Sequence, residues 1–106
     1  MATYLVTKLN TGKRNTYLCN TNSPSSTMSI PGDYIQISYT NVDNLFNMNT
    51  ELPVYNVIYF DSSGTKQNVY ICQNSFEDVF QYFKSNYGIS NFQSINKTPY
   101  TWYELR

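Results

Sequence analysis

The 106-residue sequence contains no histidine and only seven basic and seven acidic residues. Without histidine, the chain lacks the commonest general base of enzymes and the nitrogen ligand of most zinc sites. Its formal net charge of zero argues against nucleic-acid binding, which needs a basic face to displace counterions. The one basic cluster, Lys13-Arg14, lies beside a predicted turn and is typical of a solvated hairpin tip.

Long apolar runs are also missing. No run approaches the roughly 18 residues that a membrane-spanning helix needs. The first ten residues, MATYLVTKLN, lack the basic start and apolar core of a signal peptide. We therefore expect a soluble protein, located in the host cytoplasm or in a virion if the gene is viral.

Groups that could carry chemistry are scarce. The two cysteines, Cys19 and Cys72, are either free buried thiols or a disulfide, and sequence does not separate these alternatives. A Ser-Lys pair could be built around Ser62, Ser63 and Lys66, but an ordinary turn explains that segment equally well. The carboxylates are scattered beside turns or lie at a predicted helix start. We therefore predict no catalytic residue, no cofactor and no metal site, and expect that the protein is not an enzyme.

Neutral polar and aromatic residues take the place of charge. The chain has 14 Asn, 11 Ser, 11 Thr and 11 Tyr, and 17% of its residues are aromatic. This aromatic content argues against intrinsic disorder. The length suits a single domain, residues 1–106.

Alternating and β-branched segments between turn residues predict six strands. Residues 54–60 (VYNVIYF) are apolar on both faces, as expected of a central strand. Residues 21–32 form a predicted loop, 42–46 have the apolar spacing of two helical turns, and 89–98 form a polar connection. The predicted strands are 3–9, 15–20, 33–40, 54–60, 67–73 and 100–105.

One principal helix is predicted over residues 75–87. Ser75 and Asp78 have the spacing of a capping box, and Gly88 can take the left-handed conformation that ends a helix. An apolar stripe at i, i+3, i+4 and i+7 is formed by Phe76, Val79, Phe80 and Phe83.

Together these elements predict an α+β fold. We expect a mainly antiparallel sheet of five or six strands, with helix 75–87 packed on one face through its apolar stripe. The remaining predicted core residues are Val6, Leu18, Ile35, Ile37, Val57, Ile58, Val69 and Ile71.

The two halves of the chain repeat a short pattern. Residues 17–20 (YLCN) recur as residues 70–73 (YICQ), and Val6 precedes its turn much as Val57 does. This indicates an internal duplication of a β-hairpin unit, with chance similarity as the alternative. Paired units of this length resemble βγ-crystallin domains, but residues 90–95 lack the acidic pair of that family's calcium signature. We carry over neither the family nor its ligands.

Binding suits this composition better than catalysis. Tyrosine is enriched at protein interfaces because a rigid ring supplies area and its hydroxyl supplies a hydrogen bond. A small core has little room for eleven tyrosines, so we expect some of them on the sheet surface opposite the helix. The predicted partner-binding residues are Tyr34, Tyr39, Tyr55, Tyr59, Tyr100, Trp102 and Tyr103.

The sequence thus predicts a non-enzymatic protein-interaction module: a small inhibitor, an adaptor or a virion-associated protein. Abundant Asn and Tyr fit a gene rich in A and T, as many viral and phage genes are. Its partner would be another protein or a second copy of the chain. A carbohydrate-binding protein and a self-assembling structural β-rich protein are the alternatives.

Overall fold

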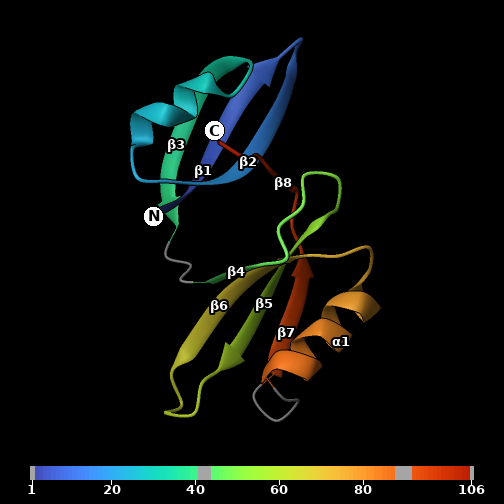
Figure 1. The fold of residues 1–106 in the computed structure, drawn as a ribbon. Helices are drawn as coiled ribbons and strands as arrows, with labels where there is room; N and C mark the ends of the chain where they lie inside the picture. Colours follow the sequence, from blue (N-terminus) through green and yellow to red (C-terminus); the bar gives the residue numbers. More distant parts are fainter. Residues whose placement is uncertain (1, 41–43, 88–91, 106) are drawn as a thin grey trace. The chain divides into compact units, whose positions relative to one another are not determined.

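The computed structural model describes residues 2–40, 44–87 and 92–105, and the chain divides into two compact units. Unit 1 comprises Met1–Asn41 and Tyr100–Arg106, and unit 2 comprises Val42–Pro99. Each unit has its own four-stranded sheet (Figure 1). The described chain is therefore mainly β with one α-helix. The predicted single sheet of five or six strands is wrong, and the single domain stays a prediction.

Unit 1 is built on a β-hairpin of β1 (Ala2–Asn10) and β2 (Lys13–Thr21). Thr11 and Gly12 connect these strands with positive φ angles of 49° and 80°, as a tight hairpin turn requires. The short 3-10 helix η1 (Pro24–Ser29) then leads to β3 (Asp33–Thr40), which pairs antiparallel with β1. The last strand, β8 (Tyr100–Trp102), pairs parallel with β2, so the sheet order is β3-β1-β2-β8.

The core of unit 1 lies on the sheet face that packs against the end of η1. Val6, Cys19 and Ile30 are its buried members, and Val6 and Leu18 confirm their predicted burial. Ile35, predicted as core, is 38% exposed. The reason is a β-bulge, since the pairing of β1 and β3 passes from Gln36 to Tyr34 and leaves Ile35 unmatched. Partly buried residues around this core are Tyr4, Tyr17, Ile37, Tyr103 and Leu105.

Unit 2 is built on a second hairpin, β5 (Val54–Phe60) and β6 (Lys66–Cys72). The central position predicted for residues 54–60 is confirmed, because β5 pairs with both β6 and β7 (Phe92–Lys97). The predicted helical turns at 42–46 are wrong over the described part, where β4 (Asn44–Phe46) pairs parallel with β6. Residues 41–43 lie outside the described residues. The polar connection predicted at 89–98 contains β7.

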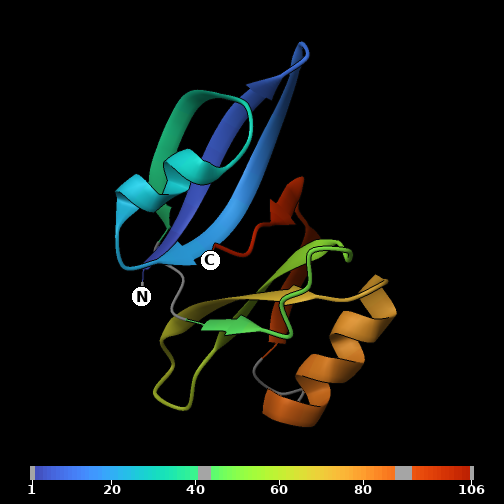
Figure 2. The ribbon, with the colours of Figure 1, turned by 45° about the horizontal axis from the view of Figure 1, so that its top comes forward.

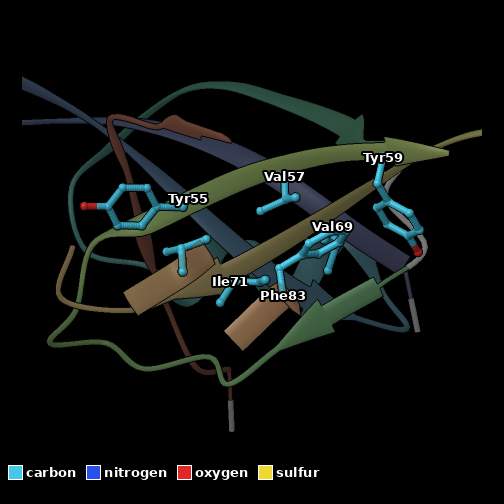
Figure 3. Close-up of a cluster of buried hydrophobic side chains, with 7 residues drawn as sticks. Tyr55, Val57, Tyr59, Val69, Ile71 and Phe83 are labelled. Atoms are coloured by element: carbon cyan, nitrogen blue, oxygen red, sulfur yellow. The ribbon is translucent and has the colours of Figure 1, made fainter. Parts of the chain in front are cut away.

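The one α-helix, α1 (Phe76–Tyr87), packs on this sheet (Figures 1 and 2). The predicted N-cap is confirmed, since Ser75 Oγ accepts the Asp78 backbone N–H at 3.3 Å. The reciprocal contact joins the two side chains, because the Ser75 hydroxyl donates to Asp78 Oδ2 at 3.1 Å. Phe76, predicted as core, is 51% exposed because it is the first residue of the helix and covers Tyr55 from outside. Gly88 lies outside the described residues. Figure 3 shows the buried cluster beneath α1: Tyr55, Val57, Tyr59, Val69, Ile71, Val79 and Phe83.

The two sheets share one topology. In each, a hairpin is followed by a helical segment and by a third strand that pairs antiparallel with the first, while a fourth strand pairs parallel with the second. The bulge also recurs: pairing shifts after Thr7 in β1 and after Ile58 in β5. By this register Ile35 corresponds to Gln93, and Tyr39 corresponds to Lys97.

The same register corrects the alignment of the two cysteines. Val6 pairs with Tyr17, and its counterpart Val57 pairs with Val69 rather than with Asn68 or Tyr70. Cys19 therefore corresponds to Ile71, one residue before Cys72. Since neighbouring strand residues point to opposite faces, Cys19 lies on the helix-covered face of its sheet and Cys72 does not.

Candidate interaction surface

Strand β3 carries the most exposed aromatic residues of unit 1. It lies at one edge of the sheet and, among the described residues, pairs only with β1. Tyr39 is 66% exposed, Tyr34 is 44% exposed, and Ile35 at the bulge is 38% exposed. The edge therefore combines unpaired backbone groups with exposed apolar area.

Packing against β1 orients the two tyrosines of β3. Tyr39 lies opposite Tyr4, and their rings meet edge to face at 5.9 Å between centroids. Tyr34 lies opposite Lys8, whose Nζ is 5.3 Å from the centre of the Tyr34 ring. Each ring therefore contacts a residue of β1, while both tyrosines remain exposed to solvent.

Lys8 is a feature that sequence reasoning missed. It is almost fully buried, at 2% exposed, and the aromatic ring of Tyr34 offers its ammonium group a favourable cation–π contact. Gly32 helps to bury it. With φ at 112°, a Cβ on Gly32 would lie 3.1 Å from the Leu9 carbonyl oxygen and 3.2 Å from Lys8 Cβ. The alternation of β1 did place Lys8 on the face of Val6, but a lysine is normally expected in solvent.

Two of the predicted partner-binding residues are buried instead of exposed. Tyr55 is 3% and Tyr59 is 6% exposed, both on the sheet face that α1 covers. The Tyr55 ring is 5.0 Å from that of Phe76, and the Tyr59 ring is 5.3 Å from that of Phe83. Both tyrosines lie on the same face of β5 as Val57, because alternate residues of a strand share a face. The helix packs on that face, so the predicted exposure of Tyr55 and Tyr59 is wrong.

The remaining predicted residues, Tyr100, Trp102 and Tyr103, are partly buried at the other edge of the unit 1 sheet. Tyr103 donates its backbone N–H to the Leu18 carbonyl oxygen at 2.9 Å, and its ring meets that of Tyr17 edge to face at 5.8 Å. Strands β1 and β2 separate this edge from β3. The seven predicted residues therefore do not form one surface, and only Tyr34 and Tyr39 share an exposed strand.

The hairpin loop of unit 2 is held together by Asp61. Its Oδ1 accepts the Ser63 hydroxyl at 2.6 Å and the backbone N–H groups of Ser63 and Thr65, each at 2.9 Å. Oδ2 accepts the Gln67 amide at 2.9 Å. These hydrogen bonds, that from the Ser63 hydroxyl first, lower the Asp61 pKa to about 2. Because the Ser63 hydroxyl serves this turn, the loop is better explained by structure than by a Ser-Lys pair.

Both thiols are free and buried. Burial raises the pKa of Cys19 to about 11 and also raises that of Cys72, against a smaller lowering by the Asn49 backbone. Cys72 Sγ donates a weak hydrogen bond to Met48 Sδ at 3.9 Å. Protonated thiols are poor nucleophiles and poor metal ligands, so the environment of both groups is that of structural cysteines.

Within the described ranges, no three Cys, Asp or Glu side chains gather as a metal site would need. In the same ranges, no helix is long and apolar enough to cross a membrane. The chain was also compared with protein-family models, curated proteins and solved structures. None of these three comparisons finds a match. The function therefore has to be inferred from the chain's own surface.

Proposed function

We propose that the chain is a non-enzymatic protein-interaction module that binds a protein partner along β3. The observation that carries this proposal is the combination of a free strand edge with the exposed rings of Tyr34 and Tyr39. An extended partner segment can hydrogen-bond to such an edge while rigid aromatic rings supply contact area. A small inhibitor, an adaptor or a virion-associated protein would use the surface in this way.

The chemistry of the remaining groups supports binding over catalysis. The two thiols are held in their neutral form by burial, and the Ser63 hydroxyl is engaged by Asp61. We also propose that the shared topology of the two sheets, with its recurring bulge, reflects an internal duplication of one hairpin unit.

Site-specific photocrosslinking in the cell that produces the protein tests the binding surface. A photoreactive phenylalanine replaces Tyr39, and the matched control carries it at Lys97, the corresponding position of β7. We expect discrete protein adducts from position 39 and none of these from position 97. Adducts from neither position, or the same adducts from both, would contradict the assignment to β3. Glycan-array binding that depends on Tyr39 would favour the carbohydrate alternative.

A further inference from the structure

The four sheet edges differ in how well they are protected against pairing with another chain. Edges β4 and β8 have only three residues each, and short edges are poor templates. Edge β7 has six residues, ends in Lys97 and is followed by Pro99, and lysine and proline both discourage pairing. Edge β3 is the longest, with eight residues, and its single charge is Asp33 at the start.

Because the two sheets share one topology, the edges β3 and β7 can be compared residue by residue, and two positions account for the difference in protection. At the bulge, β7 has Gln93 where β3 has Ile35. Four residues further along, β7 has Lys97 where β3 has the 66%-exposed Tyr39. The same structural edge thus carries an amide and a charge in unit 2, but an aliphatic and an aromatic side chain in unit 1.

The bulge at Ile35 disturbs the first part of the β3 edge, because bulges interrupt regular pairing. The regular stretch is residues 36–40 (QISYT), which contains no charged residue. Every antiparallel register of this stretch with itself places an uncharged residue opposite an uncharged residue. The whole chain also has a net charge of zero, so two copies do not repel each other through net charge.

We propose that the partner bound by β3 is a second copy of the chain, paired antiparallel along residues 36–40 about a twofold axis. This inference rests on the proposed function of β3. Antiparallel pairing is the stronger of the two arrangements, and a twofold interface is self-complementary. The two unit 1 sheets then form one continuous eight-stranded sheet. The assembly stops at a dimer, because the other edge of each sheet is the three-residue β8.

The test transfers the protective residues of β7 to β3 in the full-length chain. The double variant Ile35→Gln/Tyr39→Lys is compared with wild type and with Asn96→Lys, which adds one positive charge to the exposed edge of β7. Sedimentation equilibrium over a wide concentration range should show wild type and Asn96→Lys rising from 12.3 kDa towards twice that mass. The double variant should need at least about tenfold more protein to associate, a loss of about 1.4 kcal/mol.

Hydrogen exchange locates the contact independently of any substitution. Amides in residues 36–40 should become better protected as the wild-type concentration rises, while those of β7 should not change. A wild type that stays monomeric at every concentration overturns the inference. The inference is also overturned if the double variant associates as strongly as wild type. It is overturned as well if Asn96→Lys weakens association as much as the double variant does. Unchanged circular dichroism, together with unchanged unfolding midpoints at concentrations where all three proteins are monomeric, shows that the variants are folded.

The outcomes separate this inference from the proposed function. A monomer that still crosslinks from position 39 to a different protein refutes the dimer and leaves β3 as a binding surface. A monomer without any crosslink from position 39 refutes both.

Discussion

Two phenylalanines of α1 offer a matched test of where the core of unit 2 lies. Phe83 is fully buried, whereas Phe76, two helical turns earlier on the predicted stripe, is 51% exposed. The Phe83 ring lies 5.3 Å from Tyr59, 4.9 Å from Tyr87 and 5.9 Å from Phe92. The same substitution to alanine at the two positions should therefore have unequal effects on the free energy of unfolding.

The expected magnitudes follow from burial. Removing a fully buried phenylalanine ring costs about 3–5 kcal/mol, because transfer energy is lost and a cavity remains. Full burial of a phenylalanine contributes about 1.5–3 kcal/mol, so replacing the half-exposed Phe76 by alanine should lower the free energy of unfolding by about 1 kcal/mol. The free energy of unfolding falls by about 2 kcal/mol per M of urea in a small protein. The urea concentration at the unfolding midpoint should therefore fall by about 2 M for Phe83→Ala and about 0.5 M for Phe76→Ala.

Helical circular dichroism is the appropriate signal, because α1 is the only α-helix among the described residues. Fluorescence of Trp102, the single tryptophan, reports on unit 1 and provides a second probe in the same titration. Equal losses at the two positions, or a larger loss for Phe76→Ala, would refute the packing of α1 described above.

Two further predictions concern pH. Burial holds the Cys19 pKa at about 11 against 9.0 for the free group, so its contribution to stability is complete below pH 9.0 and is lost as the pH rises through about 11. Over this pH interval, the free energy of unfolding of Cys19→Ala should fall less steeply with pH than that of wild type. Cys19 in the native protein should also resist alkylation at neutral pH. Asp61 has a pKa of about 2 against 3.8, so its contribution is present above pH 3.8 and is lost as the pH falls through about 2. Carboxyl chemical shifts followed through an acid titration check this directly, and a midpoint near 3.8 would contradict the turn geometry.

Local signals in the sequence predicted most of the secondary structure. Alternation and turn residues placed the strands at 33–40 and 54–60, which are the bounds of β3 and β5. The Ser75 capping box placed the start of α1. These elements are determined by neighbouring residues, so a single sequence is enough to find them.

Elements that depend on distant partners were missed. The segment 42–46 has helical apolar spacing in the sequence, but its residues 44–46 form strand β4 by pairing with β6. In β7 the bulge at Gln93 breaks the alternation of Phe92 and Ile95, so the segment resembled a polar loop. Alternation puts Tyr55 and Tyr59 on one face of β5, but nothing in their own sequence says which face a helix will cover.

The discontinuity of unit 1 has a consequence for the order of folding. Its sheet is complete only when β8 has joined β2, and the whole of unit 2 lies between these strands in the chain. During synthesis, β1, β2 and β3 therefore emerge long before the strand that finishes their sheet. Contacts between such distant segments form slowly because a long loop must close first. We expect unit 2, a continuous segment, to fold first and unit 1 to reach its final stability last.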